Sequence, residues 1–495
     1  MENPKWKTPA SKAGEEFEMI AKTFQGLETV LATELIDLGA NNIQIGRRMV
    51  SFTGNKELLY RANFQLRTAI RILMPIKHFR ATSADEVYEA VQKIDWTNYL
   101  TNETTFAVDS VVFSNEFRHS KFVAYKVKDA IVDQMRERTG GRPNIRVTNP
   151  DLQLHIHIAE YDCTLSLDTS GESLHRRGYR QKSVEAPLNE VLAAGIIMLT
   201  GWKGDCDLID PMCGSGTIAI EAALIARGIA PGVYRDEYAF EKWPDFDKEL
   251  FDSIYEDDSK EHDFSHHIYG YDINHNAVAS ATTNVKAAGL SKEITVAQQD
   301  FADFKQPKEK AIIITNPPYG ERISAPDLLG LYKMIGSKFK HDFTGNDAWV
   351  LSYREECFDQ IGLKPSLRTP LYNGSLECEL RKYQMFSGKF NDMRAGGGDI
   401  KTAQERRMMA DRKRFKQHRD FKDKLEDDPR ERFTRKKDRE DFRRDSKRGD
   451  FRKDFRDERK DFRGNDRKDF RGERKPFDKN KAGKKYGKKR YDDED

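Results

Sequence analysis

Short apolar strands alternate with helical segments between about residues 170 and 387, and this alternation restricts the possible folds more than any other feature. Strand–helix repeats of this kind build a parallel, doubly wound sheet. We therefore predict an α/β class, with a Rossmann-like domain over residues 169–390 that carries an insertion rich in acidic and aromatic side chains at about 230–266. The strands are predicted at 207–210, 268–271, 294–296, 311–315 and 348–351, with a helix at 217–227.

The preceding region, residues 17–168, has a mixed α/β pattern. Apolar residues at helical spacing predict an amphipathic helix over residues 121–138, with Phe122 and Tyr125 on or near its apolar face. Lysines on the same segment are available to solvent. The region is therefore predicted to be an α+β unit that precedes the Rossmann-like domain.

A strand is predicted from Leu152 to Ile158, where aliphatic and polar residues alternate. The pattern makes it half-buried, with His155 and His157 on its polar face. Because neither histidine has a carboxylate or cysteine at metal-ligand spacing, we interpret both as ordinary surface residues of the strand rather than metal ligands.

The composition changes near residue 391, where the apolar residues needed for a core disappear. Residues 391–495 hold 39 Lys and Arg against 27 Asp and Glu, a net charge of +12; the totals of 85 and 82 then leave 46 against 55, or −9, before it. Such a segment cannot bury enough apolar surface to offset the entropy of ordering, so we predict a disordered basic tail. Its repeated Asp-Phe-Arg triplets would suit single-stranded RNA, and the alternative is a solubilising tail without a specific ligand.

The cysteines and apolar runs limit the class of protein further. Five scattered cysteines without a CxxC pair predict neither a disulfide framework nor a zinc site. The first residues are polar, and the longest apolar run, Val191–Leu199, is far shorter than the roughly 20 residues that span a bilayer. We therefore expect a soluble, cytoplasmic protein with no metal and no membrane partner.

The strand at 311–315 is followed by Asn316-Pro317-Pro318-Tyr319. Two prolines end the strand and fix a rigid turn at its carboxyl edge, where open α/β sheets bind ligands. The Asn316 carboxamide oxygen and the Pro317 carbonyl could accept both hydrogens of an exocyclic amine on a planar base, and the Tyr319 ring could stack on that base. An ordinary strand-ending turn is the alternative interpretation.

Three other turns at predicted strand ends suit an adenosyl cofactor. The first strand leads into a glycine-rich turn that lacks the endings of a P-loop or a complete dinucleotide fingerprint. Asp272 ends the second strand and could bind a ribose diol, and Asp300 ends the third near the expected adenine. Either acid could instead be a helix N-cap. The glycine-rich turn consists of Asp210, Pro211, Met212, Cys213, Gly214, Ser215, Gly216 and Thr217.

Together these motifs resemble the class I S-adenosylmethionine-dependent methyltransferases that act on base amino groups. Further segments are similar to a subgroup with an N-terminal ferredoxin-like and THUMP RNA-binding region, in particular the bacterial 23S rRNA guanine-N2 methyltransferases of the RlmL type. The second methyltransferase domain of some bacterial members is replaced here by the basic tail. The segments that carry the resemblance are 26–28, 119–122, 126–130, 171–180, 186–190, 240–243 and 371–378.

The resemblance implies an enzyme that methylates the N2 amine of a guanine in 23S rRNA of the large ribosomal subunit, with S-adenosylmethionine as its cofactor. It implies that the glycine-rich turn, Asp272, Asp300 and Asn316 bind this cofactor, and that the Asn316–Tyr319 turn is catalytic. RNA contacts are expected from His119, Lys121, Lys126, Arg176, Arg177 and Arg180. Open alternatives are a guanine in tRNA, the N6 amine of adenine, and a ribosome-assembly protein that binds RNA without catalysis.

Overall fold

The structure is a computed structural model that describes residue 8 and residues 14–386, apart from 118, 185–186, 306–309 and 321–323. The chain divides into two compact units, Met1–Met393 and Arg394–Asp495, and every described residue lies in the first. The tail predicted over 391–495 lies outside the described residues. Within the described part of the chain, no helix is long and apolar enough to cross a membrane.

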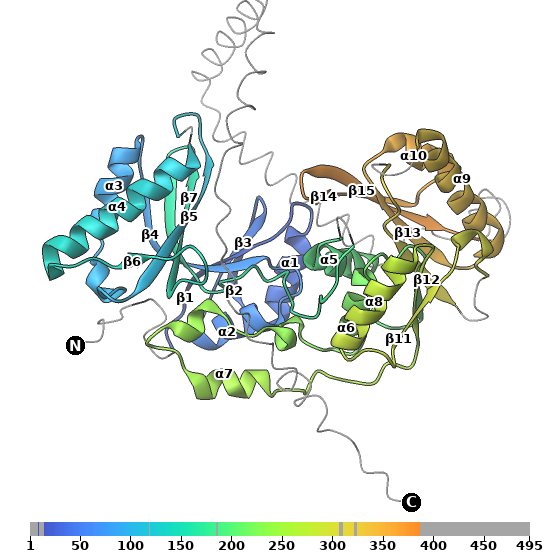
Figure 1. Cartoon of the computed structure of the whole chain (residues 1–495), viewed down its shortest axis with the longest axis horizontal. Helices are drawn as coiled ribbons and strands as arrows, with labels where there is room; N and C mark the ends of the chain where they lie inside the picture. Colours follow the sequence, from blue (N-terminus) through green and yellow to red (C-terminus); the bar gives the residue numbers. More distant parts are fainter. Residues whose placement is uncertain are drawn as a thin grey trace, which may run out of the picture. The chain divides into compact units, whose positions relative to one another are not determined.

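The N-terminal half contains an eight-stranded sheet in the order β2-β3-β1-β4-β8-β7-β5-β6 (Figure 1). Strand β4 pairs with β1 on one side and with β8 on the other, so the sheet is continuous across the region. Its elements are β1 (Phe17–Lys22), α1 (Glu28–Asp37), β2 (Asn41–Gly46), β3 (Met49–Gly54), α2 (Lys56–Gln65), β4 (Arg71–Arg80), α3 (Ala84–Gln92), β5 (Thr105–Phe113), α4 (Ser120–Thr139), β6 (Asn144–Ile145), β7 (Leu152–Ala159) and β8 (Asp162–Asp168).

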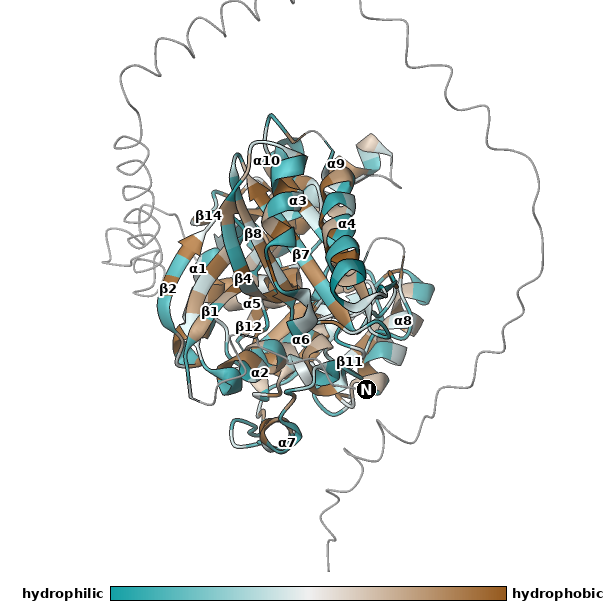
Figure 2. Cartoon of the chain, turned by 90° about the vertical axis from the view of Figure 1, so that its left-hand side faces the viewer, coloured by the Kyte–Doolittle hydropathy of each residue, from teal (hydrophilic) through white to brown (hydrophobic). Residues whose placement is uncertain are grey.

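Helices α1 to α4 share one hydrophobic core with this sheet. Figure 2 shows hydrophilic residues along the outward sides of α3 and α4, with hydrophobic strands behind them. The predicted helix at 121–138 is confirmed as α4, but the placement of Phe122 and Tyr125 on or near its apolar face is wrong. The buried stripe includes Val123 and Val127, so Phe122 and Tyr125 point outward with 52% and 58% of their surface exposed.

Strand β7 corrects the prediction for His155. The strand lies between β5 and β8, with His155 opposite Asp109 and Ser166, and only 6% of the histidine is exposed. Burial, followed by nearby positive charge, lowers the pKa of His155 to about 3, so the imidazole is neutral at pH 7. His157 is half-buried, and burial lowers its pKa to about 4. The predicted strand is therefore confirmed as β7, but its predicted half-burial is wrong, because both of its faces are largely covered.

The second sheet has the order β11-β10-β9-β12-β13-β15-β14, with β9 to β13 parallel and β15 antiparallel to β13. This is a doubly wound sheet, and the predicted α/β class and its five strands are confirmed. The elements are α5 (Glu190–Thr200), β9 (Asp207–Asp210), α6 (Thr217–Ala226), α7 (Lys248–Tyr255), β10 (Ile268–Asp272), α8 (His275–Ala287), β11 (Ile294–Gln298), β12 (Ala311–Thr315), α9 (Ala325–Asp342), β13 (Asp347–Ser352), α10 (Glu355–Ile361), β14 (Leu367–Asn373) and β15 (Leu376–Gln384).

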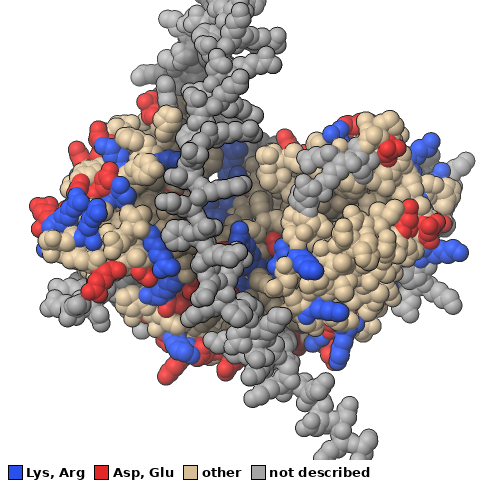
Figure 3. Space-filling view, viewed as in Figure 1, with Lys and Arg blue, Asp and Glu red and all other residues tan. Residues whose placement is uncertain are grey.

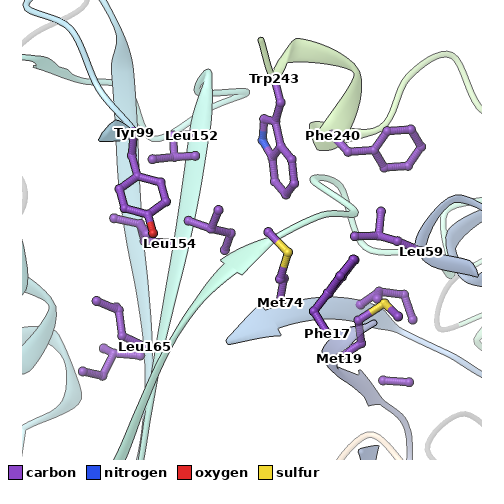
Figure 4. Close-up of a cluster of buried hydrophobic side chains, with 14 of the residues drawn as sticks. Phe17, Met19, Leu59, Met74, Tyr99, Leu152, Leu154, Leu165, Phe240 and Trp243 are labelled. Carbon is purple, nitrogen blue, oxygen red and sulfur yellow. The ribbon is translucent and has the colours of Figure 1, made fainter. Parts of the chain in front are cut away.

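The segment between α6 and β10, which contains the predicted insertion, packs against the N-terminal region. Phe240 stacks on Tyr60 of α2 with ring centroids 4.5 Å apart, and the Lys56 ammonium lies 3.3 Å from the Asp245 carboxylate. Phe240 and Trp243 also join the core that holds Met74 of β4 (Figure 4). The insertion thus ties the doubly wound sheet to the N-terminal sheet through buried aromatic contacts.

Candidate cofactor and base site

The predicted site residues come together because their strands are neighbours. Strand β9 pairs with β10 on one side and with β12 on the other, and all three run parallel. Their carboxyl ends therefore lie along one edge of the sheet, where open α/β sheets bind ligands. This arrangement brings the glycine-rich turn, Asp272 and the Asn316 turn to a single edge.

The glycine-rich turn after β9 is shaped by two left-handed glycines. Gly214 has φ +55° and Gly216 has φ +81°, a region that other residues adopt only with strain. A Cβ on Gly216 would lie 3.2 Å from the Ala281 side chain of α8. Most side chains of the turn are buried, so the turn presents mainly its backbone, as close approach to a ligand requires.

Asp272 lies at the end of β10 and holds the turn in place. Its Oδ2 accepts a hydrogen bond of 3.0 Å from the Gly214 backbone N–H, and its Oδ1 accepts one of 2.8 Å from Asn274. Each carboxylate oxygen retains a lone pair for a second donor such as a ribose hydroxyl. The next residue, Ile273, is an aliphatic side chain with 66% of its surface exposed. The acceptor oxygens of Asp272 and a turn that presents mainly its backbone fit the adenosine of S-adenosylmethionine.

The two other predicted acids have different surroundings. Asp210 is 1% exposed. Burial, together with the nearby Asp272 charge, raises the pKa of Asp210 to about 8, so this carboxyl group is largely protonated at neutral pH and supports the turn from behind. Asp300 is partly exposed and caps a short helix by accepting a 2.9 Å hydrogen bond from Ala302 N. This is the N-cap role that was one of its two sequence interpretations.

The Asn316 turn is closed by its own tyrosine. The Tyr319 hydroxyl donates a hydrogen bond to Asn316 Oδ1. The Tyr319 ring makes an edge contact with Tyr353, which follows β13, with centroids 5.3 Å apart. Burial raises the pKa of Tyr319 well above its usual value, so the phenol remains a donor. A base amine that binds Asn316 Oδ1 must replace or share this hydrogen bond.

Two of the arginines predicted to contact RNA are engaged inside the protein. Arg177 is 2% exposed, and its guanidinium donates to Glu221 Oε1 at 3.4 Å and to the carbonyl oxygens of Leu174 and Arg67. No face of Arg177 is left for a phosphate. The Arg180 side chain is 17% exposed and forms an ion pair of 2.7 Å with Glu190.

The remaining predicted RNA contacts lie on the surface. Arg176 is paired with Glu172 at 2.7 Å, and both side chains are more than half exposed. His119 and Lys121, at the start of α4, are exposed, whereas the Lys126 ammonium lies 2.6 Å from the Asp85 carboxylate. On the part of the described surface where α3 and α4 lie, Figure 3 shows cations interspersed with acids rather than a uniformly basic face.

Sequence reasoning missed three features near these residues. Ile273 could have been noticed as an aliphatic residue directly after a strand-end acid. Phe122 and Tyr125 add exposed aromatic rings to α4, with the Lys126 ammonium 5.6 Å from the Phe122 ring centroid. Asn284 of α8 is fully buried and bonds to the glycine-rich turn, a role for which the sequence carries no signal.

No group of His, Cys, Asp and Glu among the residues that the structure describes is arranged to hold a metal ion. The parallel sheet, the glycine-rich turn and the strand-end acid define instead a class I S-adenosylmethionine-dependent methyltransferase. Family models agree with this class: residues 18–73 match an RlmL ferredoxin-like domain, 81–168 a THUMP domain, and 177–382 an RMKL-like methyltransferase domain.

Similar proteins narrow the class further. A putative RNA methyltransferase of Synechocystis sp. is 38% identical, with 74% of this chain and 96% of that protein covered. The ribosomal RNA large subunit methyltransferase K/L of Syntrophotalea carbinolica is 39% identical over 74% of this chain but 53% of its own length, so the chain spans about half of such a relative. A solved putative methyltransferase complexed with SAH has a TM-score of 0.68 and 31% identity, covering 76% of this chain and 100% of that one. The chain belongs to the family of THUMP-containing, S-adenosylmethionine-dependent RNA methyltransferases.

Proposed function

We propose that this protein transfers a methyl group from S-adenosylmethionine to the exocyclic N2 amine of a guanine in 23S rRNA. The observation that carries the proposal is the position of the Asn316-Pro317-Pro318-Tyr319 turn. It follows β12, which pairs directly with the strand that ends in the cofactor turn. A base held at Asn316 would therefore lie beside the methyl donor. The rRNA substrate is supported by the K/L relatives, and the choice of guanine N2 by the resemblance noted in the sequence.

The chain's own residues would act by positioning the amine. Asn316 Oδ1 and the Pro317 carbonyl accept its two N–H groups, which turns the nitrogen lone pair toward the cofactor. The cofactor supplies a strongly electrophilic methyl group when bound. Because the amine proton becomes far more acidic once nitrogen carries the methyl group, a dedicated general base is not required. The Tyr319 phenol, released from Asn316, would offer its ring to the base.

Cofactor binding would depend on the turn after β9 and the residues beside it. We assign the ribose hydroxyls to Asp272, whose carboxylate oxygens can each accept a second hydrogen bond, and the adenine to the side chain of Ile273 and the carboxylate of Asp300. Pro211, Cys213, Ser215 and Thr217 would shape the cradle, with the left-handed glycines allowing close backbone approach.

RNA contacts are assigned to the surface residues that remain available. Lys121 and Lys126 of α4, with His119 just before the helix, lie near Phe122 and Tyr125, so the lysines could neutralise phosphates and the rings could stack on bases. Lys126 is paired with Asp85, but the Asp85 side chain is 81% exposed, so this surface pair costs little to break. Arg176 is retained for the same reason, whereas Arg177 is not.

The test is methyl transfer from labelled S-adenosylmethionine to protein-free 23S rRNA and, separately, to tRNA, followed by mass spectrometry of the nucleosides. Label on the exocyclic amine of guanosine in rRNA is the expected result. Label on N6 of adenosine, or in tRNA alone, would replace the proposed substrate with one of its alternatives. Tight RNA binding with no transfer to either RNA or to assembling subunits would favour an RNA-binding protein without catalysis.

A further inference from the structure

Arg180 contacts the glycine-rich turn, and each nitrogen of its guanidinium donates a hydrogen bond to an oxygen atom of the protein. Its Nη1 donates to Ser215 Oγ at 2.7 Å and its Nη2 to Thr217 Oγ1 at 2.9 Å. Its Nε donates to Glu190 Oε1 at 2.7 Å, and Nη2 also donates to the Leu188 carbonyl at 3.1 Å. One planar fork therefore joins the turn after β9 to the first turn of α5.

Asn284 holds the chain next to Arg180 against the same turn. Its Oδ1 accepts hydrogen bonds from the backbone N–H groups of Gln181 and Lys182 at 2.9 and 3.0 Å. Its Nδ2 donates to the Lys182 carbonyl at 2.8 Å and to the Ser215 carbonyl at 3.0 Å. Residues 180–182 are thus fixed to Ser215 in two ways: the Arg180 side chain bonds to the Ser215 hydroxyl, and the Asn284 carboxamide links the backbone of residues 181–182 to the Ser215 carbonyl.

The charges in this network suit a structural role for Arg180 in the glycine-rich turn rather than phosphate binding. Glu190 is 4% exposed and neutralises Arg180, and the guanidinium already donates to four oxygens. Because Arg180 donates to the hydroxyl oxygens of Ser215 and Thr217, the protons of these hydroxyls must point elsewhere. The two hydroxyl oxygens lie 3.4 Å apart, so one can donate to the other, and both residues are only 3% exposed, which makes them part of the internal support of the turn.

We propose that Arg180 is a positioning residue of the cofactor turn and takes no part in contacting RNA. It orders a loop whose two left-handed glycines would otherwise leave it with many conformations. It also fixes the side chains of Ser215 and Thr217 inside the turn. The inference rests on the cofactor part of the proposed function and is independent of which RNA is methylated.

The test compares Arg180→Gln/Glu190→Gln with Glu190→Gln alone in the full-length protein. The double variant removes both buried charges together, so neither is left unpaired. We expect it to weaken binding of S-adenosylhomocysteine, measured by calorimetry without RNA, by about tenfold or more. Hydrogen exchange of the amides of residues 212–217 should become faster in the ligand-free protein. Glu190→Gln alone, which keeps the hydrogen bonds of Arg180 to Ser215 and Thr217 but removes its carboxylate partner, should weaken cofactor binding less than the double variant does.

RNA affinity and its salt dependence distinguish a positioning role for Arg180 from the sequence prediction that Arg180 contacts RNA. The double variant should bind RNA as wild type does, whereas Arg176→Gln, in the same segment, should weaken RNA binding and leave cofactor affinity unchanged. The proposal would be overturned if the double variant kept wild-type cofactor affinity and wild-type hydrogen exchange of the amides of residues 212–217. It would also be overturned if the RNA affinity of the double variant depended less steeply on salt concentration than that of wild type.

Thr217→Val gives a second test if the double variant does not fold. This change removes one acceptor of Arg180 with little change of volume and no change of charge. We expect weaker cofactor binding and faster exchange of the turn. Wild-type values for both would contradict a positioning role. Neither measurement depends on methyl transfer, so a failure of the rRNA assay would not be mistaken for a failure here.

Discussion

At the scale of single residues, the site separates groups that would hold the base from groups that would hold the cofactor. Asn316 stands at the end of β12, and its carboxamide oxygen accepts from Tyr319. Asp272 stands at the end of β10 and binds the backbone of the glycine-rich turn. Because different strands carry them, substitution of one should leave the function of the other largely intact.

Asn316→Ala should lower turnover by at least about 100-fold, because the amine loses an acceptor that orients its lone pair. Affinity for S-adenosylhomocysteine should stay within a few fold of wild type. Single-turnover kinetics and calorimetry on the same preparation measure the two quantities. A matching loss of cofactor affinity would mean that Asn316 has a structural role instead.

Asp272→Ala should weaken cofactor binding by about 10- to 100-fold, since it removes charge-assisted hydrogen bonds to the ribose and loosens Gly214. Calorimetry with S-adenosylhomocysteine checks this. Asp303→Ala is a matched control, because Asp303 is an exposed carboxylate close to the third strand end. Equal affinities for Asp272→Ala and the control would remove the ribose assignment.

At the scale of secondary-structure elements, the predictions succeeded where a pattern reports a local property. Strands β9, β12 and β13 were predictable because both of their faces are buried and they read as short apolar runs. Strand β7 was also predicted, but its burial on both faces was not, because alternation separates two faces without revealing that the second is also covered. The roles of Arg177 and Arg180 were not predictable either, because their partners Glu221 and Glu190 are known only once the chain has folded.

Burial of His155 in β7 should make stability depend on pH. The unfolded histidine binds a proton below about pH 6.5, whereas the folded one, with its pKa lowered to about 3, does not. Stability from this group is therefore present above the unfolded pKa and is lost as pH falls from 6.5 toward 3, by up to about 1.4 kcal/mol per pH unit. Urea unfolding at pH 5 and pH 7.5 should show a smaller pH dependence for His155→Gln than for wild type. Parallel pH profiles would contradict the burial argument.

At the scale of the whole described unit, the insertion between α6 and β10 connects the catalytic sheet to the N-terminal sheet. Phe240 stacks on Tyr60 and is 1% exposed, and Lys56 donates a 2.7 Å hydrogen bond to the Asp245 carbonyl. Arg67, just after α2, donates to the carbonyls of Leu224 and Ile229 at 3.2 and 2.7 Å. These contacts would therefore keep an RNA that is bound to the N-terminal region in a fixed position relative to the methyltransferase sheet.

Phe240→Ala should destabilise the protein by about 3–5 kcal/mol, because it removes a large buried ring from the core that the insertion shares with the N-terminal sheet. Thermal unfolding should separate into two transitions if this contact is what couples them. Phe246→Ala is a matched control in the same aromatic group, since Phe246 is only partly buried. A single transition with an unchanged midpoint in Phe240→Ala would show that the insertion does not couple the sheets.

The measurement that tests the central claim most directly first locates the labelled guanosine in 23S rRNA, and then compares a fragment that contains this guanosine with a copy that has inosine in its place. Inosine lacks only the N2 amine, so stacking and the rest of the base edge are retained. The account requires transfer to the guanosine fragment and none to the inosine fragment, which should still compete for binding with similar affinity. Transfer that persists on the inosine fragment would show that the methyl group goes to another atom, and Asn316 would not be the residue that selects the amine.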